Sequence, residues 1–196
     1  MSPVTCADGR VRCDWAATHP LHTVYHDREW GAPLRDARAL FELLVLETFQ
    51  AGLSWLTILK RREGFVRAFQ GFDPAVVAAY GPADMERLMA DPGIIRNRLK
   101  VEATPVNARA FLAMQERPGG FAGYLWDFVD GRPVVNAWRE QSQVPATTPL
   151  SDRVAKDMKQ RGFRFLGSTS CYAFLQSSGV VNDHLVDCFR FAELTA

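Results

Sequence analysis

The sequence contains no long apolar run. No stretch comes near the roughly 18 consecutive apolar residues that a membrane-spanning helix needs. The first 14 residues also lack the apolar centre of a secretory signal peptide. We therefore expect a protein that has no membrane partner and is located in the cytoplasm.

An excess of charge of one sign is also missing. The 23 basic residues nearly balance the 22 acidic ones, and the formal net charge is +1. A nucleic acid would therefore have to bind to a local basic patch, because the chain as a whole does not attract it. Candidate patches occur at residues 60–62, 96–100 and 156–164. Each is also typical of an ordinary solvated helix face.

Cysteine is scarce, and two of the four cysteines are each paired with a histidine. In a reducing compartment, four cysteines favour metal binding or plain burial over a set of disulfides. One Cys and His pair lies near each end of the chain, and four such side chains complete a tetrahedral zinc site. The candidate ligands are Cys13, His26, His184 and Cys188.

The two pairs differ in how easily their members can meet. His184 and Cys188 are four residues apart, which on a helix places them on one face. Cys13 and His26 need a loop to bring them together. The alternative is a core cysteine with unrelated surface histidines. Cys6 and Cys171 are the expected non-ligands.

Alternating strand patterns are almost absent, so we predict an all-α fold. With 196 residues, 47% of them hydrophobic, the chain can bury one substantial core, and we expect a single unit over residues 1–196. We place its helical part at about 36–145 and a metal-bound lobe at about 12–31 and 150–190.

Pro105 should kink or interrupt its helix. The predicted helices cover residues 37–52 after the cap Asp36, 55–69 after Ser54, a segment from 74 after Asp73, 82–88, 97–116, 121–128, 151–162, 169–177 and 181–188.

Residues 85–103 have the pattern of a helix-hairpin-helix unit. A Pro-Gly turn at Pro92 and Gly93 separates two predicted helices. In such a unit the N–H groups around the glycine and the positive end of the second helix contact a DNA phosphate. Arg98 or Lys100 would add charge. An ordinary interhelical turn is the alternative interpretation.

Glu47 is an acid on a helix that otherwise appears buried. A carboxyl group there must be paired, protonated, or reserved for a ligand with donors or positive charge. A capping or salt-bridged glutamate is the simpler interpretation. Tyr25, Trp30 and Trp55 could each be a core aromatic residue. Together with the acid they indicate a pocket that stacks a flat cationic ring.

At these residues the sequence closely resembles the DNA-3-methyladenine glycosylase I (Tag) family. The resemblance extends over nearly the whole chain, from Cys13 to Cys188. It implies an all-helical, divergent helix-hairpin-helix glycosylase with one structural zinc ion bound by the two Cys and His pairs. The matching segments are residues 12–15, 19–21, 25–31, 47–55, 93–97, 126–129, 159–165 and 181–184.

The resemblance also implies roles for individual residues. Glu47 would be the catalytic and recognition residue that accepts the amino edge of 3-methyladenine, in a pocket that Trp55, Trp30 and Tyr25 line. His22 stands where the family frequently has tyrosine and would form one pocket wall. The flipped base would leave a gap for Leu53 to fill. The implied DNA contacts are Gln50, Gly52, Leu53, Gly93, Ile95 and Arg96.

The expected function is therefore removal of 3-methyladenine from double-stranded alkylated DNA by a monomer with structural Zn²⁺. Two alternatives are a catalytically silent module that binds the damaged base and a zinc-organised helical interaction domain. A zinc hydrolase fits less well, because four protein ligands leave no open position for water.

Overall fold

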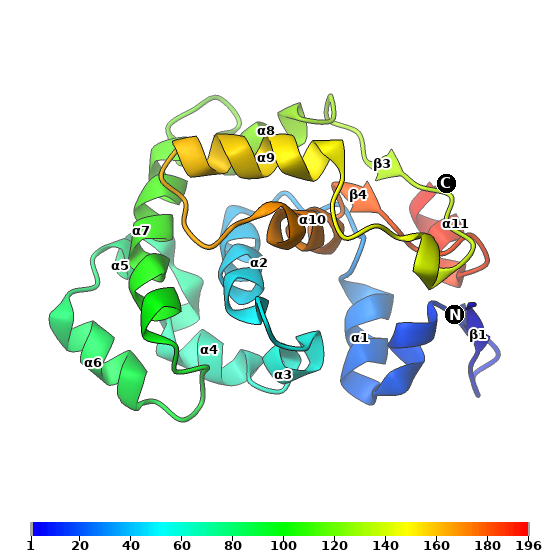
Figure 1. Cartoon of the computed structure of the whole chain (residues 1–196), viewed down its shortest axis with the longest axis horizontal. Coiled ribbons are helices and arrows are strands. Elements are labelled where there is room, and N and C mark those ends of the chain that lie inside the picture. Colours follow the sequence, from blue (N-terminus) through cyan, green and yellow to red (C-terminus); the bar gives the residue numbers. More distant parts are fainter. Residues whose placement is uncertain (1, 196) are drawn as a thin grey trace.

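Helices make up most of the computed structural model, which describes residues 2–195 and confirms the all-α prediction (Figure 1). The α-helices are α1 (Pro20–Arg28), α2 (Ala37–Gln50), α3 (Trp55–Leu59), α4 (Arg62–Ala68), α5 (Pro74–Ala78), α6 (Pro82–Ala90), α7 (Arg98–Gln115), α8 (Gly120–Asp127), α9 (Pro149–Gln160), α10 (Ser168–Ser177) and α11 (Phe189–Thr195). The 3₁₀ helices are η1 (Asp14–Thr18), η2 (Gln70–Phe72) and η3 (Gln141–Gln143).

Four two-residue strands form two small ladders. Strands β1 (Val4–Thr5) and β2 (Val11–Arg12) pair antiparallel. Strands β3 (Val134–Val135) and β4 (Val181–Asn182) pair in parallel. The second ladder joins segments that are far apart in the sequence.

Side chains cap several helices where the sequence predicts helix starts. Asp36 accepts from the N–H of Ala39 at 2.8 Å at the start of α2. Ser54 caps α3 and Asp73 caps α5, in which proline occupies the first turn. These starts depend only on neighbouring residues, and for this reason the sequence predicts them well.

Two predicted helix boundaries are wrong, and of the two effects predicted for Pro105 the interruption of its helix does not occur. The helix predicted over residues 55–69 is divided into α3 and α4, and α4 packs its Gly64 so closely on Gly93 that a Cβ on Gly64 would lie 2.3 Å from the Gly93 carbonyl oxygen. Helix α9 begins at Pro149 with Thr148 as its cap, and Ser151 completes a capping box from inside the helix. Pro105 does not interrupt α7, which packs against α2, α5, α6 and α8.

The helix predicted over residues 181–188 is also wrong. Val181 and Asn182 form β4, and the chain then continues without regular structure to α11. Pairing with β3 satisfies the backbone here, since the N–H of Val134 donates to Val180 and that of Asn136 donates to Asn182. The Asn182 side chain then accepts from the N–H of His184 at 3.2 Å, which stabilises a turn in place of a helix.

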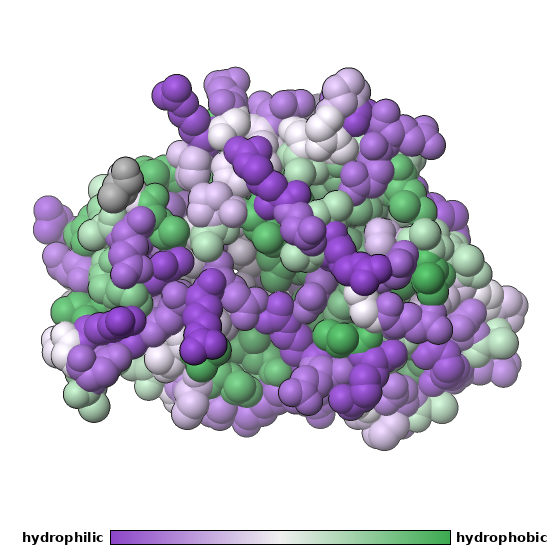
Figure 2. All heavy atoms as spheres, turned by 180° about the vertical axis from the view of Figure 1, so that it is seen from behind, coloured by the Kyte–Doolittle hydropathy of each residue, from purple (hydrophilic) through white to green (hydrophobic). Residues whose placement is uncertain are grey.

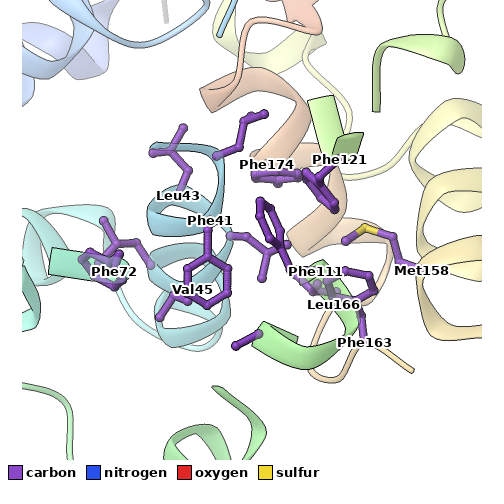
Figure 3. Packing of buried hydrophobic residues seen from close by; sticks show 14 of the residues in the cluster. Phe41, Leu43, Val45, Phe72, Phe111, Phe121, Met158, Phe163, Leu166 and Phe174 are labelled. Carbon is purple, nitrogen blue, oxygen red and sulfur yellow. The ribbon is translucent and has the colours of Figure 1, made fainter. Parts of the chain in front are cut away.

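Helix α2 lies at the centre of the main hydrophobic core (Figure 3). Nine of its side chains are buried, which explains why its sequence is apolar on every side. The surrounding core is rich in phenylalanine, and its labelled members in Figure 3 are Phe41, Leu43, Val45, Phe72, Phe111, Phe121, Met158, Phe163, Leu166 and Phe174. Glu47 therefore belongs to the most buried helix of the protein.

A second, smaller cluster brings the two ends of the chain together. Cys13, Leu185 and Cys188 are buried in it, and partly buried aromatic side chains pack around them. Figure 1 shows the N-terminal segment, α1 and α11 side by side at one end of the molecule, and α11 contacts β2.

Polar side chains cover much of the surface on the face shown in Figure 2, between smaller apolar areas. Among residues 2–195, no helix has both the length and the apolar character required to cross a membrane.

Lys100 connects the end of α2 to the start of α7. Its ammonium group donates to the carbonyl of Phe49 at 2.9 Å and to that of Ala51 at 2.6 Å. The side chain is buried, and burial lowers its pKa. Lys100 therefore caps α2, and of the two residues predicted to add charge near a phosphate the exposed one is Arg98.

We predict that Lys100→Met destabilises the protein by about 1–3 kcal/mol, because two buried carbonyl groups lose their donor. Exposed Lys156 on α9 offers a matched control, and Lys156→Met should change the free energy of unfolding by less than about 0.5 kcal/mol. Urea unfolding of the three proteins measures the difference. Equal midpoints for all three would show that the cap contributes nothing.

Candidate functional site

A cavity of about 200 Å³ opens between the helical core and the small cluster at the chain ends. It takes its lining from η1, α1, α2, α3, η3 and α10, so segments from most of the chain contribute. The lining residues are Trp15, Tyr25, Trp30, Glu47, Gln50, Trp55, Gln141, Ala173 and Gln176.

The structure brings together most of the predicted pocket residues. Tyr25, Trp30, Glu47 and Trp55 all line the cavity, and so does Gln50. His22 lies outside the lining, with its ring edge-on to Trp15 at 5.7 Å between centroids and its Nδ1 atom 2.8 Å from Thr18 Oγ1.

Four lining residues were not predicted from the sequence, namely Trp15, Gln141, Ala173 and Gln176. Trp15 lies in one of the segments that resemble the family, two residues after the candidate ligand Cys13. This position is the one sequence signal that could have identified it. Ala173 and Gln176 are three residues apart on α10, so they share the face that borders the cavity. Nothing in the local sequence distinguishes that face from a core face.

Glu47 is an almost unpaired acid inside this cavity. Its side chain is 3% exposed, and its Oε2 atom has no hydrogen-bond partner in the described part of the chain. Burial raises the pKa of Glu47 to about 8, and the nearby hydroxyl of Ser177 only partly opposes this effect. The carboxyl group is therefore mostly protonated at neutral pH, and a cation in the cavity would favour its ionised form.

Trp55 supplies a second unsatisfied polar atom. The indole Nε1 is buried and finds no acceptor among residues 2–195. Indole can only donate, whereas an ionised carboxylate can only accept. With Glu47 ionised, the cavity presents one free donor and one free acceptor, and a ligand with both functions would satisfy them.

Aromatic rings form much of the remaining wall. The Trp15 and Trp30 rings pack edge to face, with 5.1 Å between their centroids and 84° between their planes. Tyr25 and Trp55 contact each other at the same centroid distance with a 50° tilt. Electron-rich ring faces attract cations, so these walls suit a flat, positively charged ligand.

The turn after α2 adjoins the cavity and points an apolar side chain outward. Gly52 has φ +82°, and an added Cβ would meet no atom within 4 Å. Leu53 is 39% exposed. The Gln50 amide donates to the Leu53 carbonyl at 3.3 Å and so links this turn to the cavity wall.

The segment between α6 and α7 carries the other predicted DNA contacts. Arg96 is exposed and Ile95 is partly buried. The backbone N–H of Gly93 donates to Asp91 Oδ1 at 2.7 Å. A phosphate would therefore have to displace this carboxylate to reach that N–H group.

Four buried side chains next to the cavity could hold a metal ion. The donor atoms of Cys13, His26, His184 and Cys188 all lie within 4.8 Å of one another. His184 Nδ1 lies 3.2 Å from His26 Nε2, 3.7 Å from Cys188 Sγ and 3.8 Å from Cys13 Sγ. A tetrahedral ion with typical zinc bond lengths separates two nitrogens by about 3.3 Å and a nitrogen from a sulfur by about 3.6 Å. The four side chains therefore fit a tetrahedral ion.

Neighbouring groups orient both imidazoles toward the centre of this cluster. His26 Nδ1 lies 2.8 Å from Asp27 Oδ1, and His184 Nε2 lies 2.9 Å from the carbonyl oxygen of Trp30. Each oxygen accepts the N–H of its histidine, which leaves the other ring nitrogen free to bind a metal. Arg12 in turn pairs with Asp27 at 2.7 Å. The Trp30 contact joins the cluster directly to the cavity wall.

Comparison with known families identifies relatives over most of the chain. The family model described as methyladenine glycosylase matches residues 15–191. DNA-3-methyladenine glycosylase 1 of Escherichia coli (strain K12) is 48% identical over 177 residues, which are 90% of this chain and 95% of the relative. DNA-3-methyladenine glycosylase of Haemophilus influenzae is 45% identical over 178 residues, which are 91% of this chain and 96% of the relative.

Solved structures give the same result for the fold. A crystal structure of 3-methyladenine DNA glycosylase I superimposes with a TM-score of 0.88 and 49% identity, over 91% of this chain and 98% of the other. A variant of 3-methyladenine DNA glycosylase I in complex with 3-methyladenine superimposes with a TM-score of 0.88 and 39% identity, over 91% of this chain and 96% of the other.

The raised pKa of Glu47 makes stability depend on pH. Between the ordinary value of 4.5 and about 8, the folded protein keeps a proton that the unfolded chain has released, so the stability that this proton provides is lost as pH rises. We predict that Glu47→Gln increases the free energy of unfolding more at pH 9 than at pH 5, by on the order of a few kcal/mol, and raises the melting temperature accordingly.

Thermal unfolding across this pH range measures the effect. The exposed acid Glu116 at the end of α7 is the control, and Glu116→Gln should give a small difference that does not change with pH. A constant difference between wild type and Glu47→Gln from pH 5 to pH 9 would contradict a protonated Glu47.

Proposed function

Because this chain belongs to the methyladenine glycosylase family, we propose that it removes 3-methyladenine from double-stranded alkylated DNA by hydrolysing the N-glycosidic bond. The observation that carries the proposal is the unpaired carboxyl of Glu47 in a cavity with aromatic walls. A family relative has been solved with 3-methyladenine bound. The proposed role for this chain is base-excision repair.

The free polar atoms of the cavity complement an adenine edge. The 6-amino group of adenine donates hydrogen bonds, and its ring nitrogens accept them. Glu47 Oε2 is a free acceptor and Trp55 Nε1 a free donor. Methylation at N3 makes the base of the nucleotide cationic, which favours both the aromatic walls and an ionised Glu47.

The same positive charge explains how little acid catalysis the reaction needs. The bond between C1′ and the base nitrogen breaks, its electron pair moves to the base, and 3-methyladenine leaves as a neutral molecule. Water adds its oxygen to C1′ and releases a proton to solvent. Glu47 holds the base and stabilises the positive charge that spreads to the sugar in the transition state.

The base must leave the duplex to enter a cavity of this kind, at a cost of a few kcal/mol. We assign the role of filling the gap to Leu53, which is exposed beside the cavity. Gly52 allows close approach of the backbone. The α6–α7 unit acts as the DNA-binding helix-hairpin-helix, with contacts from Gly93, Ile95 and Arg96.

We assign one structural Zn²⁺ to the four Cys and His ligands. Two thiolates and two imidazoles suit zinc, and four protein ligands leave no position for a catalytic water. The ion would fasten the lobe formed by about 12–31 and 150–190 to the helical part at about 36–145, within one unit. A monomeric state and a cytoplasmic location remain predictions from the sequence.

Base release from alkylated DNA tests the assignment. We predict that wild type releases free 3-methyladenine, that Glu47→Gln lowers the rate roughly 100-fold through loss of a charged hydrogen bond, and that Trp55→Ala lowers it in the same direction. Chromatography of the released bases measures these rates, and Glu116→Gln should release the base at the wild-type rate.

Two outcomes would refute the proposal. Equal release by wild type and both pocket variants would show that the cavity takes no part in the reaction. Specific binding of alkylated duplex without any released base would identify a silent damage-binding module.

Removal of one metal ligand tests the zinc assignment separately. We predict that Cys188→Ser lowers the zinc content below one ion per chain and destabilises the protein by several kcal/mol, because folding and metal binding are coupled. Elemental analysis and thermal unfolding measure both effects. Cys6→Ser is the control. Cys6 lies outside the cluster, so this variant should retain one zinc ion per chain. Full zinc content in Cys188→Ser would disprove the assignment.

A further inference from the structure

Asp183 is a buried carboxylate for which the proposed reaction has no role so far. It is 2% exposed and lies between β4 and the metal ligand His184. Two donors reach each of its oxygens. Oδ1 accepts from Asn136 Nδ2 at 2.7 Å and Trp138 Nε1 at 2.8 Å, and Oδ2 accepts from Gln176 Nε2 at 2.7 Å and the hydroxyl of Tyr172.

This arrangement fixes which way the Gln176 amide faces. Four donors surround the two carboxyl oxygens of Asp183, and the indole of Trp138 can only donate. Because both carboxyl oxygens of Asp183 accept hydrogen bonds, the Gln176 amide must turn its NH₂ group toward Asp183. The opposite orientation would place two oxygens in contact.

The cavity therefore gains an acceptor of fixed orientation. Gln176 lines the cavity, and its Oε1 atom receives no hydrogen bond from the described residues. The backbone holds the residue as well, since its carbonyl accepts from the N–H of Gly31 at 3.1 Å. Tyr172 is one turn earlier on α10 and binds the same Asp183 oxygen.

Glu47 alone cannot distinguish an amino group from a carbonyl. As a carboxylate it accepts from the 6-amino group of adenine, and as a neutral acid it can donate to the 6-oxygen of guanine. Its raised pKa makes both forms accessible near neutral pH. Gln176 has no such freedom, because reversing its amide would break the contact with Asp183.

We propose that Gln176 Oε1 determines specificity for 3-methyladenine against 3-methylguanine, and that Asp183 is the positioning residue that keeps this oxygen facing the cavity. The inference rests on the proposed glycosylase function and deepens it. At position 6, adenine offers an amino group that donates to the fixed acceptor, whereas guanine offers an oxygen that the acceptor repels.

The first experiment replaces the acceptor. Wild type and Gln176→Met act on methylated DNA that contains both bases, and chromatography gives kcat/KM for each. We expect the ratio of 3-methyladenine to 3-methylguanine release to fall about tenfold, because methionine removes one hydrogen bond to adenine and the repulsion of guanine. An unchanged ratio would overturn the role of Gln176.

The second experiment exchanges the two polar groups. Gln176→Glu alone places two carboxylates against each other and should lower the ratio. Adding Asp183→Asn supplies an amide donor to that carboxylate, whose second oxygen then faces the cavity as an acceptor. The double variant should recover the wild-type ratio to within about threefold. Failure to recover any selectivity, in a protein that is folded, would overturn the role of Asp183.

Controls separate these roles from effects on folding and metal binding. Asp152→Asn alters an exposed carboxylate on α9 that accepts from Ser168 at the start of α10, and it should leave the ratio unchanged. Each variant is compared at equal zinc content, because Asp183 adjoins His184. If wild type itself releases no 3-methyladenine, the proposed function fails. If wild type releases 3-methyladenine but the ratio is the same in the variants, only the specificity inference fails.

Discussion

The burial of one carboxyl group on the most buried helix of the protein is the constraint on which the site depends. Helix α2 packs nine buried side chains into the core, and Glu47 is among them. Removing a carboxylate from water without a partner costs several kcal/mol, and the protein limits this cost by keeping the group protonated, as its raised pKa indicates. A cationic base reverses the balance, because it stabilises the ionised form. Glu47 thus contributes binding energy when a cationic ligand occupies the cavity.

The walls around this acid are assembled from opposite ends of the chain. The first 30 residues provide three aromatic side chains of the lining, and α10 provides Ala173 and Gln176. The contact between His184 and the Trp30 carbonyl joins the two, and Gly31 is required there because a Cβ would come within 2.9 Å of the His184 ring. The cluster of Cys and His side chains is therefore linked to the cavity through the position of Trp30.

Local signals in the sequence predicted the features that depend on neighbouring residues. Asp36, Ser54 and Asp73 each cap a helix through atoms two or three residues away, and the acid on α2 stood out against its apolar surroundings. The segment 181–188 could not be predicted in this way, because β4 forms only when Val134 and Val135 pair with it. Gln176 was missed for a related reason, since its role depends on Asp183 and on the packing of α10 against the cavity.

A pocket for a damaged base needs both a group that responds to charge and a group that does not. Glu47 can gain or lose a proton, which suits it to select a cation. The same change converts it from a hydrogen-bond acceptor into a group that can also donate. The Gln176 amide has no charge to change. Its contact with Asp183, whose oxygens also accept from three other donors, prevents the amide from rotating by half a turn. Selection by charge and selection by base edge thus rest on different side chains. Two of the four donors come from the segment between β3 and η3, so the ladder that replaced the predicted C-terminal helix also supports the part of the site that reads the base.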